Sequence, residues 1–257
     1  MTILFDEELH KYFYKEAPEL KLTSVSKIIE MYHEEFDTEK VAEKTAAKRG
    51  VTKESLIEEW KKTNSDAIKR GHAYHFYKEQ KYLKQGKING LKVFAHETDQ
   101  NLKKGFDITK LVPGIYPELI VDLPEFQVIG TADYIEIFED GTFILEDHKT
   151  NGKLESEGFK VWDPISKTKK SKMMYAPISH IHHCNLGHYS IQLSIYAFAL
   201  EEAGFNLRPN GLTINHVLFD EDGTAVDTIP YKLNYLKKEV KNLLNHFKQN
   251  HLPKIQK

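Results

Sequence analysis

Residues able to do acid–base or metal chemistry gather near the middle of the chain. A Gly-Thr-Ala-Asp segment ends at Asp133, and a Glu-Asp-His-Lys segment ends at Lys149. Because side chains alternate along a strand, Asp147 and Lys149 are expected to share one face with the apolar Phe143 and Leu145. Two carboxylates and a lysine on an apolar sheet are costly unless a divalent cation and a bound phosphate compensate them. The alternative is a solvated hairpin end with an ordinary Asp–Lys pair.

This residue set suits phosphodiester hydrolysis. The reaction needs an activated water and a positive charge near the transition state, and Mg²⁺ held by one or two carboxylates supplies both. Asp133 and Asp147 fit that role, with the backbone carbonyl of His148 as a third protein ligand. Lys149 lies one strand period beyond Asp147, where it can orient the water or neutralise phosphoryl charge.

Strands and helices of ordinary pattern surround these residues. Two apolar runs, 126–137 and 142–149, are joined by a Glu-Asp-Gly turn and predict a β-hairpin. A strand over 117–122 precedes it, and a helix over 189–203 follows it. The remaining C-terminal elements are a strand over 212–219, a short strand ending at 229 and an amphipathic helix over 233–250.

The N-terminal third is predicted to be mainly helical. We expect a short hairpin within 3–23, with strands near 10–14 and 20–22, and then a helix capped by Thr23 or Ser24. Further helices are expected over 38–48, 53–62, 64–84 and about 94–104. Together the patterns predict one α/β domain over 1–257, with a helical part over 1–110 and a core over 111–257.

Composition excludes several classes of protein. The chain has 257 residues and a net charge of −2, so DNA binding would need a local basic patch. Its single cysteine, Cys184, rules out an intramolecular disulfide and a four-cysteine iron–sulfur cluster. No apolar run approaches the ~20 residues of a membrane helix. We expect a soluble cytoplasmic protein of a bacterial or phage-infected cell, with no membrane partner.

Two further motifs flank the hairpin in a recognisable order. Upstream, Gly71 and His75 form a Gly-x-x-x-His pattern, and downstream Tyr189, Gln192 and Tyr196 lie at i, i+3 and i+7 on one helical face. With the hairpin, this order resembles the PD-(D/E)XK nuclease superfamily. The similarity is to its branch of RecB-type recombination nucleases, phage exonucleases and mitochondrial genome maintenance exonuclease, and it covers roughly residues 70–200.

The resemblance implies a fold and a set of roles. The fold would be restriction-endonuclease-like, with a central mixed β-sheet flanked by helices and a helical N-terminal portion. His75 would join Asp133, Asp147 and His148 at Mg²⁺ (or Mn²⁺) or hold a phosphate, and Gln192 and Tyr196 would position the strand and support Lys149. The implied activity is DNA exonuclease action in replication, recombination or repair, releasing 5′-phosphate products.

A lysine-rich segment outside this set has two interpretations. The lysine-rich segment Lys167, Lys169, Lys170 and Lys172 is flanked by aromatic rings and resembles a single-strand binding groove, although a solvated loop explains it nearly as well. Together with these lysines, Arg70 and Tyr189 are candidate DNA contacts.

A histidine-rich segment and a glutamate are two further candidates. The cluster His180, His182, His183, Cys184 and His188 lacks paired zinc-ligand spacing, so a loop near DNA phosphates is favoured over zinc. Glu118 is read as a surface glutamate at a strand end and is left outside the metal set.

Two alternative functions stay open at this point. One is a structure-specific endonuclease with the same site, and the other is a nucleic-acid-binding protein whose nuclease site is vestigial. The expected partner is DNA, single-stranded or with free ends, and a single-strand-binding or recombination protein is a candidate second partner.

Overall fold

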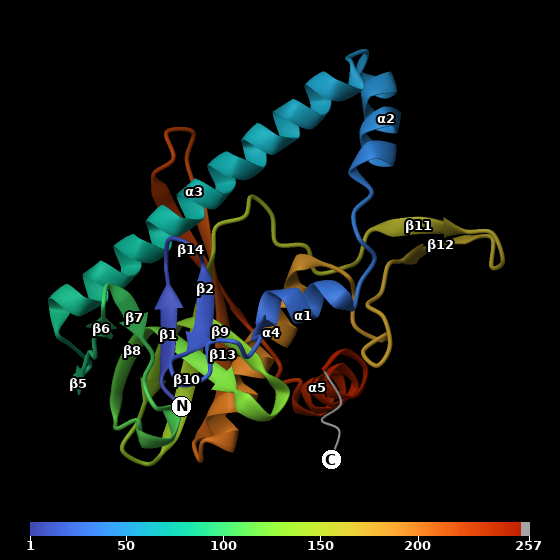
Figure 1. The fold of residues 1–257 in the computed structure, drawn as a ribbon. Helices are drawn as coiled ribbons and strands as arrows, with labels where there is room; N and C mark the ends of the chain where they lie inside the picture. Colours follow the sequence, from blue (N-terminus) through green and yellow to red (C-terminus); the bar gives the residue numbers. More distant parts are fainter. Residues whose placement is uncertain (253–257) are drawn as a thin grey trace.

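Residues 1–252 form five α-helices, a mixed central sheet and smaller antiparallel sheets (Figure 1). This arrangement comes from a computed structural model that describes residues 1–252. The predicted α/β class is confirmed. In the described part of the chain, no helix is both long enough and apolar enough to cross a membrane.

The central sheet has six strands and contains the predicted hairpin. β10 pairs antiparallel with β9 and parallel with β13, and β8 and β14 extend the sheet antiparallel beyond β9 and β13. A short strand, β3, runs parallel to the start of β9. The strands are β3 (Thr23–Ser24), β8 (Gly114–Leu123), β9 (Val128–Ile137), β10 (Thr142–Lys149), β13 (Asn206–Phe219) and β14 (Ala225–Lys232).

Three helices pack with this sheet to form the main hydrophobic core. They are α1 (Val25–Met31), α4 (Asn185–Glu202) and α5 (Lys237–His251). Ser24 caps α1 as predicted, since its side chain accepts a hydrogen bond from the amide of Lys27. α4 begins four residues earlier than expected because the Cys184 side chain caps it.

A second layer covers part of the sheet with a small antiparallel sheet. Its strands, in the order β2-β1-β7-β6, are β1 (Ile3–Asp6), β2 (Lys11–Tyr14), β6 (Glu97–Asp99) and β7 (Leu102–Lys104). Phe5 and Tyr14 pack here against Ile120 and Ile129 of the central sheet. A minor hairpin, β4 (Lys87–Ile88) and β5 (Leu91–Lys92), lies nearby, and single 3₁₀ turns occur at Ile108–Lys110 and Pro124–Phe126.

This layer corrects two predictions. The N-terminal hairpin pairs 3–6 with 11–14, rather than 10–14 with 20–22. The helix predicted over 94–104 is wrong: the region forms the β6–β7 hairpin. Gln100 and Asn101 both have positive φ (51° and 68°), which is the backbone of a two-residue hairpin turn.

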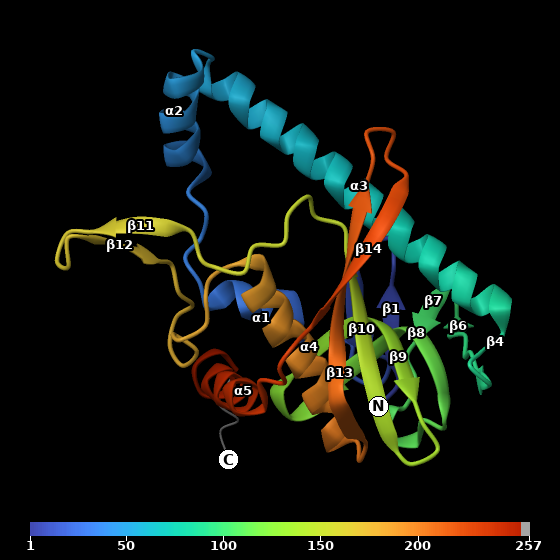
Figure 2. The same cartoon turned by 180° about the vertical axis from the view of Figure 1, so that it is seen from behind.

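An arm of two helices leaves the body (Figures 1 and 2). α2 (Thr38–Arg49) is followed by α3 (Lys53–Gln85), which is one continuous helix where two were predicted. At 1.5 Å per residue, its 33 residues span about 50 Å. The arm has its own small core of Ala42, Ala46 and Leu56.

Candidate active site

Three acidic side chains lie in neighbouring positions on β8, β9 and β10. Pro117 pairs with Tyr134 and Leu119 with Ala132, so Glu118 stands opposite Asp133. On the other edge of β9, Glu146 also pairs with Tyr134, so Asp147 is the next residue of β10 alongside Asp133. The register of the sheet therefore brings the carboxylates together.

The sheet is distorted at this row. Glu118 has a positive φ of 50°, a conformation that non-glycine residues seldom adopt and that is enriched at functional sites. The alternation of side chains between the two faces of β8 is broken at Glu118: Tyr116 before it and Leu119 after it both pack in the main core, although three positions separate them. The prediction that Glu118 is a surface residue at a strand end is wrong: it lies inside β8 and its side chain is 19% exposed.

β9 and β10 separate at Asp133. Within residues 1–252, ladder pairs on this edge of β9 are formed by β10 from Tyr134 onward and by β3 at Val128 and Ile129. In the interval, the carboxylate oxygen Oδ2 of Asp133 accepts a hydrogen bond of 2.6 Å from the amide of His148. The Asp133 side chain therefore bridges the two strands where the backbone ladder stops.

Helix α3 adds His75 to the carboxylates. Its Nδ1 lies 3.2 Å from Oδ2 of Asp133 and 3.5 Å from Oε1 of Glu118. The close approach of the helix is possible because Gly71 lacks a side chain: a Cβ there would lie 3.3 Å from Oγ1 of Thr150. The glycine of the predicted Gly-x-x-x-His pattern thus lies at a close packing contact, one helical turn before His75.

Asp147 and Lys149 form a buried ion pair on β10. The Lys149 Nζ lies 2.7 Å from Oδ2 of Asp147, whose side chain is 1% exposed. Apart from this ion pair, neither carboxylate oxygen of Asp147 has a hydrogen-bond partner among residues 1–252. A buried carboxylate with spare lone pairs is a strong candidate ligand for a cation.

Helix α4 covers this pair with the predicted polar and aromatic residues. The ring of Tyr189 lies under Lys149, with Nζ 4.6 Å from the ring centre. Gln192 donates a hydrogen bond of 3.1 Å to the hydroxyl of Tyr196. A Cβ on Gly130 would come within 2.8 Å of that hydroxyl, so the glycine admits Tyr196 against β9.

The charges of these groups depend on one another. Burial and the neighbouring Asp133 carboxylate raise the pKa of Asp147 to about 6. Burial alone would lower the pKa of His75, but Asp133 and Glu118 outweigh it and raise it to about 11. Burial also opposes ionisation of Asp133, yet the positive charges of His75 and Lys149 bring its pKa below the usual value.

The donor set fits a hard divalent cation. His75, Glu118 and Asp133 each offer a ligand atom, and these atoms all lie within 4.8 Å of one another. Carboxylate oxygens are the ligands that Mg²⁺ and Mn²⁺ prefer, and Asp147 is adjacent to Asp133 in the sheet although it lies outside this 4.8 Å group. His75 would have to lose its proton to act as a ligand.

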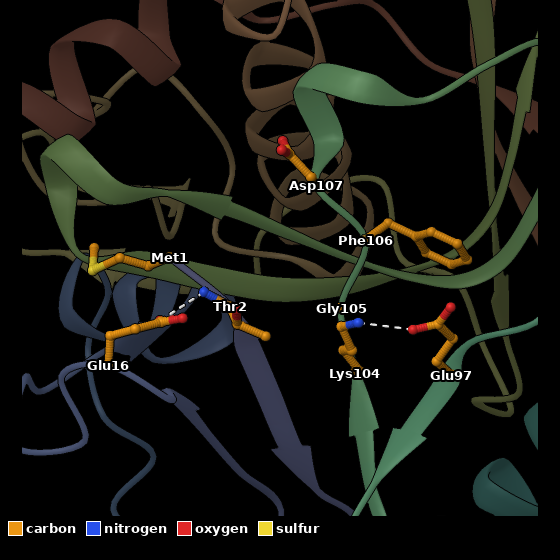
Figure 3. Close-up of a pocket in the computed structure, with 8 residues that line it drawn as sticks. All are labelled: Met1, Thr2, Glu16, Glu97, Lys104, Gly105, Phe106 and Asp107. Carbon is orange, nitrogen blue, oxygen red and sulfur yellow. Dashed lines mark hydrogen bonds and ion pairs between the residues drawn. The ribbon is translucent and has the colours of Figure 1, made fainter.

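A cavity of about 280 Å³ opens beside His75 and Glu118. Aromatic side chains from the small sheet and α3 line it, together with charged groups: Phe5, Tyr12 and Phe76, and Glu79 and Lys103. A separate hollow at the N-terminal edge shares no residue with this cavity (Figure 3). Its polar groups are already engaged, since Glu16 accepts from the amide of Thr2 and Lys104 binds Glu97.

Other predicted site residues are not brought into this cluster. The segment with the four lysines forms a hairpin, β11 (Lys160–Asp163) and β12 (Thr168–Ser171), which projects from the opposite side of the body from β6 and β7 (Figures 1 and 2). Lys170 binds Asp163 and Lys172 binds Glu34, so two of the four charges are paired.

Arg70 and His148 have contacts of their own near the cluster. The Arg70 guanidinium lies over the ring of Phe219, 5.2 Å from its centre. The His148 ring packs against Tyr74 and lies 3.4 Å from the Tyr82 hydroxyl. A metal contact by the His148 carbonyl stays a prediction.

The comparisons with known proteins leave the site to be interpreted from its own geometry. No protein-family model matches the chain, and no curated protein matches it.

Proposed function

We propose that this protein is a metal-dependent deoxyribonuclease that degrades DNA from an end. The observation that carries the proposal is the buried Asp147 beside Asp133: its Oδ2 lies 2.7 Å from Nζ of Lys149, and its Oδ1 has no partner among residues 1–252. Structural ion pairs rarely leave a fully buried carboxylate so poorly satisfied. Elements far apart in the sequence supply the surrounding groups, which is typical of an active site.

The proposed reaction is phosphodiester hydrolysis with Mg²⁺ or Mn²⁺ as cofactor. Such an ion supplies a water of lowered pKa and a counter-charge for the phosphoryl oxygens. Glu118 and Asp133 are ligands the chain offers, with His75 when neutral, and Asp147, outside this 4.8 Å group, is proposed to join them. The order of the motifs along the chain and the mixed sheet support a restriction-endonuclease-like fold of the PD-(D/E)XK type.

Lys149 has the most direct role among the other groups. Its ammonium group contacts the Asp147 carboxylate and the Tyr189 ring. Burial lowers the pKa of Lys149, but the carboxylates of Asp147 and Asp133 outweigh burial and raise that pKa above its usual value. A lysine kept charged and immobile can hold a phosphoryl oxygen and stabilise the charge that grows on it. Gln192 and Tyr196 position this group from α4.

Strand binding is proposed to use the cavity next to His75. Phe5, Tyr12 and Phe76 offer rings on which bases can stack, and stacking of this kind tolerates any sequence. Lys103 supplies a positive charge at the same wall, although Glu7 and Glu79 bind it. A single strand or a frayed end suits such a cavity better than an intact duplex.

Digestion of labelled DNA tests the proposal. Linear single and double strands labelled at the 5′ or 3′ end, and covalently closed circles, are incubated with Mg²⁺, with Mn²⁺ or with EDTA. We expect nucleotide release from linear DNA with either metal, none with EDTA, and intact circles. Cleavage of circles would instead support the endonuclease, and DNA binding without any cleavage would support the vestigial site.

Site variants identify the responsible residues. Asp133→Asn and Lys149→Ala are expected to lower the rate by at least about 10²-fold while DNA binding persists, because each removes charge needed in the transition state. His180→Ala is the matched control, since its exposed ring binds Glu239 elsewhere. A wild-type rate in either site variant would contradict the assignment.

A further inference from the structure

Three histidines from separate segments meet at a second place in the fold. His33 follows α1, His183 lies before α4, and His188 is in the first turn of α4. Their ring centres are 4.2 Å (His33–His183), 4.7 Å (His33–His188) and 5.0 Å (His183–His188) apart. Each offers a nitrogen, and these atoms all lie within 4.8 Å of one another.

The nitrogens of this cluster are poorly satisfied. Nδ1 of His183 and Nε2 of His188 are buried and have no hydrogen-bond partner among residues 1–252. Nδ1 of His33 lies 3.0 Å from the carbonyl oxygen of Glu34. Since a carbonyl only accepts, this nitrogen carries a proton, and in the neutral ring the lone pair is then on Nε2.

Ring stacking alone does not explain these contacts. Stacked imidazoles would gain dispersion energy, but burying unpartnered ring nitrogens costs free energy. Burial and the two neighbouring rings lower the pKa of His188 to about 4, so it is neutral and its lone pair is available. A ligand that accepts several imidazole lone pairs removes the cost.

Backbone hydrogen bonds hold the segments that carry these histidines close together. The amide of His183 donates to the carbonyl of Lys172, and the Lys172 side chain binds Glu34, next to His33. The amide of His188 donates to the carbonyl of Cys184 in the first turn of α4. The Cys184 thiol caps that helix and lies outside the group of ligand atoms.

We propose that His33, His183 and His188 bind a zinc ion. Neutral imidazole is the nitrogen ligand that Zn²⁺ takes, and three histidines plus one open position form a known zinc geometry. The rings are now nearly parallel, with interplanar angles of 22°, 11° and 23°, so zinc binding requires them to reorient until their in-plane lone pairs converge. The site shares no residue with the carboxylate cluster, and the proposal does not depend on the nuclease function.

A metal here would join two parts of the molecule. His33 lies at the start of the connection to α2, and His188 precedes Tyr189, which packs under Lys149. Zinc would therefore tie the base of the arm to the helix that covers the candidate active site. Such an ion would lend binding free energy to the folded state, and a water would fill its open fourth position.

Metal binding by the untagged full-length protein tests the proposal. The protein is stripped with a chelator, titrated with Co²⁺ as a spectroscopic probe and, separately, with Zn²⁺ followed by metal analysis after dialysis. We expect one tightly bound zinc per chain, visible Co²⁺ absorption of a tetrahedral nitrogen site, and a higher unfolding midpoint with Zn²⁺. Absence of tight zinc in the wild type would overturn the proposal.

Matched variants locate the ion. His33→Ala and His188→Ala are expected to bind zinc about 100-fold more weakly or worse, since loss of even an outer contact costs about 10- to 100-fold. His180→Ala and Asp133→Asn should bind it as the wild type does. Far-UV circular dichroism checks that each variant folds. If His33→Ala or His188→Ala does not fold, His33→Gln is measured in its place. Unchanged affinity in folded variants of His33 and His188 would refute the assignment.

Discussion

The two buried aspartates of the candidate site have opposite tendencies to ionise. Asp133 is kept charged by His75 and Lys149, whereas burial and Asp133 itself raise the pKa of Asp147 to about 6. A cation would favour the charged form of both. The difference makes Asp147 the group whose protonation is expected to govern metal binding near neutral pH.

This expectation predicts a particular pH dependence. Activity should rise with pH through about 6, because Asp147 must lose its proton to bind the cation. Raising the Mg²⁺ concentration should move this acid limb to lower pH, since the ion binds only the deprotonated form. The measurement is kcat/KM against pH at two Mg²⁺ concentrations. An acid limb that stays fixed would contradict it.

The sequence predicts some residues of the candidate site and misses others. The alternation of side chains correctly placed Asp147 and Lys149 together, because strand periodicity is local. Glu118 was misjudged because its place opposite Asp133 depends on the pairing of β8 with β9 and on a positive φ. His33 was missed altogether, since no local pattern links it to a residue 150 positions away.

At the level of elements, the packing of α4 on β9 is tight at Gly130. Gly130→Ala would place a Cβ 2.8 Å from both Oη and Cε1 of the buried Tyr196 ring, which would have to shift. We expect about 1–3 kcal/mol of destabilisation, as for other overpacked cores, and reduced DNA cleavage. Chemical denaturation and the digestion assay measure the two effects.

The control for this substitution is Gly152→Ala. A Cβ at Gly152 would meet no atom within 4 Å, so stability and cleavage should both stay near the wild-type values. If Gly130→Ala behaved like this control, Tyr196 would not be held as closely as the structure indicates.

The helices and strands were predicted unevenly, and the reasons are physical. The hairpin of β9 and β10 was recognised because its turn contains a glycine with φ of 75°. The β6–β7 hairpin was mistaken for a helix because Gln100 and Asn101, without glycine, form its turn. The continuous α3 was split in two because Thr63, Asn64 and Ser65 are weak helix formers that the surrounding turns nevertheless tolerate.

At the scale of the whole molecule, stability is unevenly distributed. The main core joins α1, α4 and α5 to the sheet, whereas the arm is stabilised by only a small cluster around Ala42, Ala46 and Leu56. Regions with few buried apolar contacts open locally at lower free energy. The arm is therefore expected to open independently of the sheet.

Hydrogen exchange followed by mass spectrometry checks this expectation. Amides of α2 and of the first half of α3 should exchange faster than those of α4, whose central residues are fully buried. The second half of α3, which carries His75 against the carboxylates, should be intermediate. Equal protection of the arm and α4 would show that they open as one unit.

The left-handed backbone at Glu118 lowers the stability of the fold, whereas the Glu118 carboxylate is proposed to serve the reaction. Such a conformation costs an L residue roughly 1–2 kcal/mol, and glycine adopts it freely. In a library randomised at position 118, enrichment by heat challenge alone should favour glycine or asparagine. Enrichment by DNA cleavage should keep an acidic residue there. Sequencing both pools shows which residues each selection enriches at position 118. Enrichment of the same residues in both pools would contradict this prediction.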